Sequence, residues 1–134
     1  MSNGTGFDRI GFEAGQIVQE LGWDEDVDEK LRQLLMDTVD GDLVEDSLDA
    51  VDAVWLWLRS DDDEVADALV DAMRDLSDDG FIVLVTPKVG RPGAIDASDL
   101  DEGAETAGMT LTSTHNLDSD WQAHKVVRPR GVRR

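Results

Sequence analysis

The sequence predicts a three-layer α/β protein, in which a mostly parallel sheet of about five strands lies between helices. Two short apolar runs are the main observation: residues 53–58 read AVWLWL and residues 81–85 read FIVLV. Residues 60–80 between them have helical periodicity and contain nine carboxylates. Strands that are apolar along their whole length are buried on both faces, and two parallel strands need a crossover between them. The pattern therefore predicts a strand–helix–strand unit.

The chain is predicted to begin with a leader and a first strand. Residues 1–8 contain Gly, Ser, Asn and Thr without a period, and we expect a disordered leader there, ahead of a single domain over residues 9–128. Gly15 predicts a turn. Residues 16–21 are interpreted as the first strand, with a helix as the competing interpretation.

A helix is predicted over residues 24–39, because apolar residues recur there at spacings of three and four. Asp24 or Asp26 is the expected N-cap, and Gly41 is the expected end of the helix. Residues 42–50 are interpreted as a connector that contains a short strand or one helical turn.

The crossover helix is predicted to begin at Ser60 as its N-cap, with Asp63 at the capping-box position three residues later. Gly80 is expected to end this helix in the left-handed conformation. The second apolar run is followed by residues 86–93, which contain two Pro and two Gly and therefore predict a loop.

The C-terminal part predicts one more helix and a hairpin. Ser98 is the expected N-cap of a short helix that ends before Gly108. Residues 110–115 and 123–128 predict two strands around a turn at residues 116–120, paired as an antiparallel hairpin. Alternation of strands and helices along the chain indicates an open sheet with helices on both faces.

The charge distribution bears on the kind of partner. All 31 acidic residues and eight of the twelve Lys and Arg lie in residues 1–127, which therefore carry a net charge of −23. Such a body repels nucleic-acid phosphates and anionic membrane surfaces. We expect a basic or amphipathic protein partner. Residues 129–134 are interpreted as a flexible basic tail, and nucleic-acid contact through Arg128–Arg134 is the alternative.

The amino-acid composition argues against several kinds of functional site and against a location in a membrane. The absence of cysteine excludes disulfides, thiolate nucleophiles and Cys-ligated metals. No third ligand accompanies His115 and His124, so we predict no metal site. No signal peptide is visible, and no apolar run approaches the roughly 18–20 residues that span a bilayer. We therefore expect a cytoplasmic protein, of an oligomeric state that the sequence does not indicate.

Two stretches resemble Rossmann-like methyltransferases. Residues 15–22 (GQIVQELG) resemble the opening strand of those enzymes, and residues 76–87 (LSDDGFIVLVTP) resemble a later strand. A closer resemblance, over residues 9–128, is to a family of small acidic actinobacterial proteins catalogued as domain of unknown function 3052. Three segments carry it: residues 11–28, 68–72 and 86–91. This resemblance implies a degenerate methyltransferase fold and no assigned activity.

The expected cofactor site departs from the methyltransferase pattern. The enzymes that this chain resembles carry an acid and several glycines after the first strand, which let the backbone approach S-adenosylmethionine closely. Here only Gly22 remains, and Trp23 with the following carboxylates is expected to fill that space. We therefore expect no cofactor.

A candidate cleft is predicted where the strands end, because open α/β sheets bind ligands at the carboxyl ends of their strands. Its six candidate residues are Gly22, Trp23, Asp24, Ser60, Lys88 and Arg91. Lys88 and Arg91 are either an anion contact or a connector that pairs with nearby acids.

The function expected from these observations is that of a non-catalytic, acidic binding or regulatory protein. Two alternatives stay open. One is an enzyme or sensor that binds S-adenosylmethionine or a nucleotide in the cleft, and the other is a nucleic-acid-associated protein that uses the Arg-rich tail.

Overall fold

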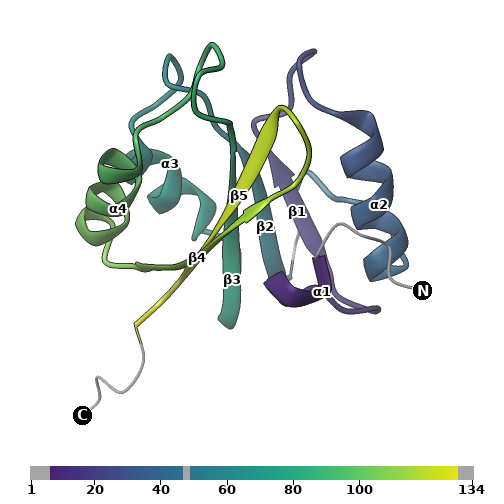
Figure 1. Ribbon diagram of the computed structural model, residues 1–134. Helices are drawn as coiled ribbons and strands as arrows, with labels where there is room; N and C mark the ends of the chain where they lie inside the picture. The colour runs from purple at the N-terminus through teal and green to yellow at the C-terminus, as the bar shows by residue number, and fades with distance from the viewer. Residues whose placement is uncertain (1–6, 47–48, 130–134) are drawn as a thin grey trace.

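Figure 1 shows the computed structural model, which describes residues 7–46 and 49–129. The described residues form four helices and five strands in the order α1, β1, α2, β2, α3, β3, α4, β4 and β5. Their bounds are α1 Phe7–Ile10, β1 Val18–Leu21, α2 Glu29–Val39, β2 Val51–Trp57, α3 Val65–Ala72, β3 Leu76–Pro87, α4 Ala97–Thr106, β4 Thr110–Asn116 and β5 Trp121–Val127.

The strands form one sheet in the order β1-β2-β3-β5-β4. β1, β2 and β3 pair in parallel, and β5 runs antiparallel between β3 and β4. The predicted fold class is therefore confirmed, including the antiparallel last strand. The predicted short strand in the connector is reduced to one parallel bridge between Val44 and Gln19 on the outer side of β1.

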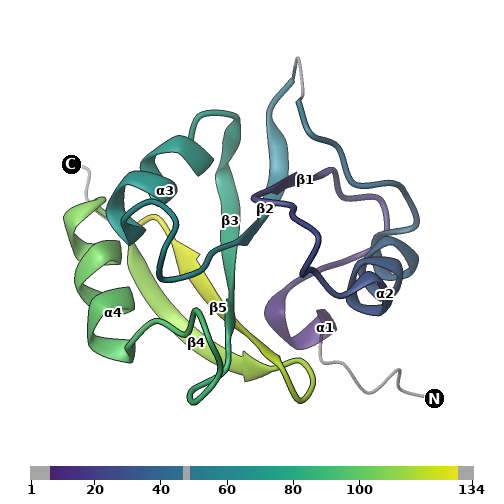
Figure 2. The ribbon, with the colours of Figure 1, turned by 90° about the horizontal axis from the view of Figure 1, so that it is seen from above.

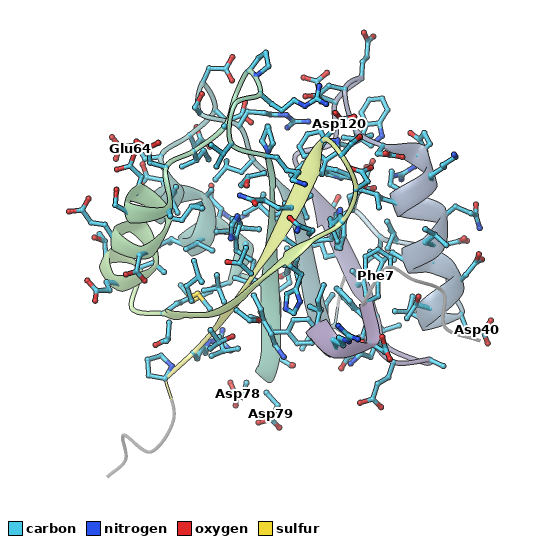
Figure 3. The ribbon with its side chains drawn as sticks, in the orientation of Figure 1. Phe7, Asp40, Glu64, Asp78, Asp79 and Asp120 are labelled. Carbon is cyan, nitrogen blue, oxygen red and sulfur yellow. The ribbon has the colours of Figure 1, made fainter. Side chains whose placement is uncertain are left out.

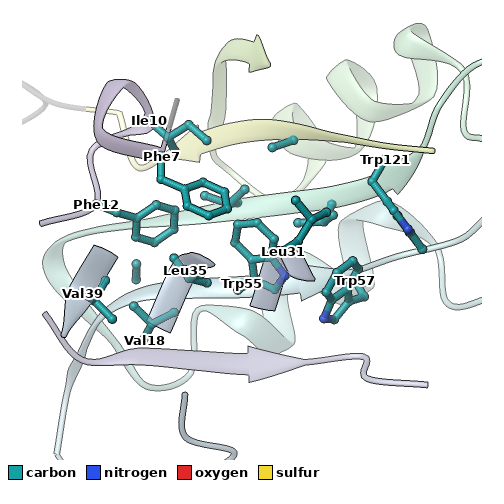
Figure 4. Packing of buried hydrophobic residues seen from close by; sticks show 14 of the residues in the cluster. Phe7, Ile10, Phe12, Val18, Leu31, Leu35, Val39, Trp55, Trp57 and Trp121 are labelled. Atoms are coloured by element: carbon teal, nitrogen blue, oxygen red, sulfur yellow. The ribbon is translucent and has the colours of Figure 1, made fainter. Parts of the chain in front are cut away.

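Helices cover both faces of the sheet, as Figure 2 shows from above, with α1 and α2 on one face and α3 and α4 on the other. Successive residues of β2 point to alternate faces, so Trp55 and Trp57 pack under α1 and α2 while Val54 and Leu56 pack under α3 and α4. The aromatic core on the α1 and α2 side is seen in Figure 4. Burial on both faces explains why the run is continuously apolar.

The N-terminal boundary differs from the prediction. Phe7 begins helix α1, is fully buried and packs edge-to-face on Trp55 with ring centroids 5.5 Å apart. Residues 7 and 8 therefore belong to the domain, and the remainder of the predicted leader lies outside the described residues. At the other end, Arg128 donates to the Ser77 carbonyl at 2.7 Å, while residues 130–134 of the predicted tail lie outside the described residues.

Helix α2 begins later than predicted. Asp28 is its N-cap, because the Asp28 carboxylate accepts hydrogen bonds from the amides of Lys30 (2.9 Å) and Leu31 (3.3 Å). Asp24 and Asp26 lie in the preceding turns. At the C-terminal end Asp40, rather than Gly41, adopts the left-handed conformation with φ of 58°.

Helix α3 is much shorter than predicted. Glu64 rather than Ser60 is its N-cap, and the helix ends at Ala72. Gly80 does not end a helix but lies inside β3, where a Cβ atom would come within 2.8 Å of the Asp52 carbonyl. β3 continues through Pro87, so the first two residues of the predicted loop are paired with β5. Asp96, rather than Ser98, is the N-cap of α4.

Candidate functional site

The carboxyl ends of β1, β2 and β3 meet at one edge of the sheet, at the top of Figure 1, and two crevices open there. One, of about 660 Å³, lies between the start of α3 and one side of α4. The other, of about 520 Å³, lies between the strand ends and the exposed side of α3. Arg59 and Asp63 line both crevices, so we treat them together as the strand-end groove.

The groove is strongly acidic. Its lining includes the ten carboxylates Asp24, Asp46, Asp62, Asp63, Glu64, Asp71, Asp75, Asp96, Asp99 and Glu102. All are exposed except the half-buried Asp75. The lining includes two guanidinium groups, and both are engaged: Arg59 with Asp26, and Arg74 with Asp71 at 3.6 Å. A groove of this composition attracts cations.

Arg59 is the central residue of the groove, and its place there was not predicted from the sequence. Its side chain is 10% exposed and bonds to Asp26 through two nitrogens, to the Gly22 carbonyl at 2.8 Å and to Asp62 at 3.4 Å. Burial would lower the pKa of Arg59, but the hydrogen bonds and charges of Asp26 and Asp62 raise it above its ordinary value. One signal was available: Arg59 is the only basic residue between positions 33 and 73.

Gly22 closes the turn after β1. Its φ is +78°, and a Cβ atom would lie 2.2 Å from the Trp57 carbonyl oxygen. This glycine therefore serves the close approach of β1 and β2, and its own carbonyl is bonded to Arg59. Gly22 itself stays exposed and lines the crevice at the strand ends.

Trp23 does not fill that space, contrary to expectation. Its side chain is 52% exposed and lines the rim of the groove, while Arg59 occupies the interior. Asp24 lies beside Trp23 in the same lining. Because Trp55, Trp57 and Trp121 are buried, Trp23 is the solvent-exposed indole of the described chain.

The six predicted cleft residues do not all come together. Gly22, Trp23 and Asp24 line the crevice at the strand ends, and Ser60 lines the crevice at α4. Lys88 and Arg91 are absent from both linings. They bind the turn between β4 and β5: Lys88 Nζ donates to the Asp118 carbonyl at 3.2 Å, and Arg91 pairs with the Asp120 carboxylate at 2.6 Å.

A buried ion pair between β1 and α2 lies next to the groove. Glu20 on β1, whose side chain is 5% exposed, accepts two hydrogen bonds of 2.7 Å from Arg32 on α2. The Glu20 carboxylate also accepts a 2.9 Å hydrogen bond from the Trp57 indole nitrogen. This network ties α2 to β1 and β2 next to the turn that contains Gly22.

The two histidines lie on paired strands, as the predicted hairpin requires, but make separate contacts. His124 is buried, and its ring nitrogens contact the hydroxyls of Thr86 (3.1 Å) and Thr114 (2.9 Å). His115 contacts Ser113 at 2.9 Å. Within residues 7–46 and 49–129, no group of three or more His, Cys, Asp or Glu is arranged to hold a metal ion.

The burial of His124 predicts a loss of stability in acid. Burial, and then the charge of His115, lower the pKa of His124 from 6.5 to about 4. As the pH falls, the unfolded state therefore takes up a proton on His124 before the folded state does. The contribution of His124 to stability is full above pH 6.5 and falls as the pH drops toward 4. Between about pH 7 and pH 5 we expect a loss of about 2 kcal/mol from this group. Denaturant unfolding at the two pH values measures it.

The control for that experiment is His124→Gln, which keeps polar atoms at the site and does not titrate. The carboxylates titrate in both proteins, so the difference between their pH dependences isolates His124. Equal pH dependence in the two proteins would contradict the prediction.

The sheet has β5 as its one antiparallel strand, and helices cover both of its faces. This strand order defines a methyltransferase-like α/β protein. Residues 7–130 match the family described as protein of unknown function DUF3052, and the chain belongs to that family. Uncharacterized proteins of Mycobacterium tuberculosis and Mycobacterium bovis are 40% identical over 123 residues, which cover 91% of this chain and 77% of each relative.

Several of the similar solved structures are described as methyltransferases. A candidate methyltransferase from Thermoplasma acidophilum has a TM-score of 0.62 at 9% identity, over 98% of this chain and 76% of that one. The pyocyanin biosynthetic protein PhzM has a TM-score of 0.63 at 12% identity, over 93% and 54%. Magnesium protoporphyrin IX methyltransferase ChlM from Synechocystis PCC 6803, with bound SAM, has a TM-score of 0.52 at 11% identity, over 87% and 71%. These likenesses show the fold.

No helix of the described residues has the length and apolarity to cross a membrane.

Proposed function

We propose that this chain is a non-catalytic, methyltransferase-like binding protein whose strand-end groove holds a basic segment of a partner protein. The observation that carries the proposal is the ten-carboxylate lining, in which both arginines already have acidic partners. A partner's lysines and arginines would therefore meet uncompensated carboxylates, and association would be steered by charge.

The shape of the groove supports an extended ligand. The carboxylates line two neighbouring crevices that share Arg59 and Asp63, and they come from several segments of the chain. The partly exposed Leu21 lies in the same lining as the half-exposed Trp23, so an amphipathic segment would find apolar contacts there too. An indole beside carboxylates also suits a cationic side chain.

The proposal is tested with a ten-residue arginine- and lysine-containing peptide, titrated at low and at high salt. The exposed Trp23 gives a fluorescence signal that quenching by neutral acrylamide separates from the buried indoles. We expect saturable binding that weakens as salt rises, because salt screens exposed charges. The double variant Asp63→Asn/Asp99→Asn removes two exposed charge contacts of about 0.2–1 kcal/mol each, so the Kd rises about 2- to 30-fold.

The matched control is Asp78→Asn/Asp79→Asn, which makes the same change of charge at the opposite end of β3, as Figure 3 shows. Equal weakening by the two double variants would mean that overall charge and not the groove binds the peptide, and would overturn the proposal. Saturable binding of S-adenosylmethionine with loss of peptide binding would favour the cofactor alternative instead.

A further inference from the structure

The crevice at the strand ends has a polar floor formed by Gln19 of β1. Gln19 pairs in register with Val54, which packs under α3 and α4, so its side chain lies on that face of the sheet. The residue is only 4% exposed, yet it lines the crevice. Buried polar side chains are normally hydrogen-bonded, so the partners of this amide bear on its role.

The amide nitrogen of Gln19 is engaged, whereas the amide oxygen is free. Nε2 donates to the Glu45 carbonyl at 2.9 Å and to the Asp75 carboxylate at 3.4 Å. Both partners only accept hydrogen bonds, so they fix which end of the amide faces them. Oε1 has no hydrogen-bond partner among residues 7–46 and 49–129. In that part of the chain the unpaired side-chain atom that is sealed from solvent is Trp55 Nε1, so Gln19 Oε1 is open to the crevice.

Carboxylates surround this free oxygen. Asp46, Asp71 and Asp75 line the same crevice, and the last two flank the C-terminal end of α3, where the helix dipole favours a cation. Arg74 lies in this lining too and pairs with Asp71 at 3.6 Å. Within the described residues, Asp46 and Asp75 have no cationic partner. The floor of the crevice therefore offers a neutral oxygen beside two uncompensated charges.

A ligand that fits this floor carries a positive charge and several N–H donors. The lysine ammonium has three donors around one nitrogen, so it can donate at once to an amide oxygen and to carboxylates in other directions. The arginine guanidinium holds its donors in a planar fork, which suits the two oxygens of one carboxylate. Here the acceptors come from β1, from the connector before β2 and from the end of α3. Separate acceptors of this kind favour the ammonium.

We infer that the crevice at the strand ends is a subsite for a lysine side chain of the basic partner segment. Its ammonium donates to Gln19 Oε1 and pairs with Asp75 and Asp46, while its alkyl stem contacts Leu21 and Trp23 in the same lining. The inference rests on the proposed function, because the lysine belongs to the segment that the groove holds. It adds a requirement for N–H donors to the attraction between charges.

Trimethylation of lysine separates the hydrogen bond from the charge. A ten-residue peptide with lysine as its only cation is compared with the same peptide in which every lysine is trimethylated, which keeps the charge and removes the N–H donors. Each is titrated into the full chain at low salt, and Trp23 fluorescence reports binding because Trp23 lines this crevice. We expect the Kd of the trimethylated peptide to be about 3- to 10-fold higher. Equal or tighter binding would show that charge or the Trp23 ring holds the cation, and would overturn the inference.

Gln19→Met locates the hydrogen bond. Methionine has about the length of glutamine and lacks the amide oxygen, so this variant should bind the two peptides alike. The matched control is Gln33→Met, which makes the same change on the exposed side of α2, outside both crevices. This control should keep the 3- to 10-fold difference. A Gln19→Met variant that also keeps it would overturn the inference.

Asp75→Asn decides the question if circular dichroism shows that Gln19→Met does not fold. The asparagine oxygen still accepts from Gln19 Nε2, and only the charge is lost. We expect the Kd of the lysine peptide to rise about 2- to 5-fold, and Asp78→Asn at the opposite end of β3 to leave it nearly unchanged. An equal effect of the two substitutions would count against the subsite.

The subsite and the groove fail in different ways. If Asp63→Asn/Asp99→Asn weakens binding but the lysine and trimethyllysine peptides bind equally well, the groove stands and the lysine subsite is wrong. If neither peptide binds saturably at low salt, the proposed function is wrong and the subsite falls with it.

Discussion

Arg32→Met is expected to lower the free energy of unfolding by about 3–5 kcal/mol at neutral pH. Arg32 makes two 2.7 Å hydrogen bonds to Glu20, whose side chain is 5% exposed. Methionine keeps most of the apolar stem and removes the guanidinium. The Glu20 carboxylate then keeps the Trp57 indole N–H as a donor but loses its cation, and an unpaired buried charge is costly. Urea denaturation followed by circular dichroism measures the loss.

The matched control is Arg74→Met, since Arg74 and Asp71 form an ion pair whose side chains are 75% and 62% exposed. Exposed pairs contribute about 0–1 kcal/mol, so this variant should be close to the unmodified protein. The double variant Glu20→Gln/Arg32→Met should recover part of the loss, because the amide oxygen still accepts from Trp57 and carries no charge. Equal effects of the two arginine substitutions would show that Glu20 is not desolvated.

The strands of the sheet centre could be predicted because their pattern is local. β2 and the second half of β3 are buried on both faces, so their residues are apolar without alternation. The α3 boundary could not be predicted in the same way. Leu69, Ala72, Met73 and Leu76 keep a helical spacing, yet Leu76 pairs with Val51 as part of β3. Local periodicity does not reveal such a long-range partner.

The position of the groove at the strand ends was predicted from the sequence, but the residues that line it were predicted only in part. The carboxyl ends of parallel strands share one edge of a sheet, which placed Gly22, Trp23 and Ser60 there. Arg59 was missed because its main partner, Asp26, is 33 residues away and is one of 31 acids in the chain. Lys88 and Arg91 were misplaced for a related reason: their partners lie in a turn that reaches them only through the pairing of β5 with β3.

Gly22→Ala is expected to lower the free energy of unfolding by about 2–5 kcal/mol, from two separate costs. A left-handed φ costs a non-glycine residue about 1–2 kcal/mol. The new methyl group would also stand 2.2 Å from the Trp57 carbonyl oxygen, so the ends of β1 and β2 must move apart. Strain from overpacking of this kind costs about 1–3 kcal/mol more.

Gly108→Ala separates these two costs. Gly108 has nearly the same φ, +80° against +78°, and no atom lies within 4 Å of the point where its Cβ would stand. This variant therefore carries the conformational cost alone, about 1–2 kcal/mol. The excess loss in Gly22→Ala measures how tightly the turn after β1 is closed against Trp57, and fluorescence quenching of Trp23 reports whether the groove shifts with it. Equal losses in the two variants would mean that the turn is free to open.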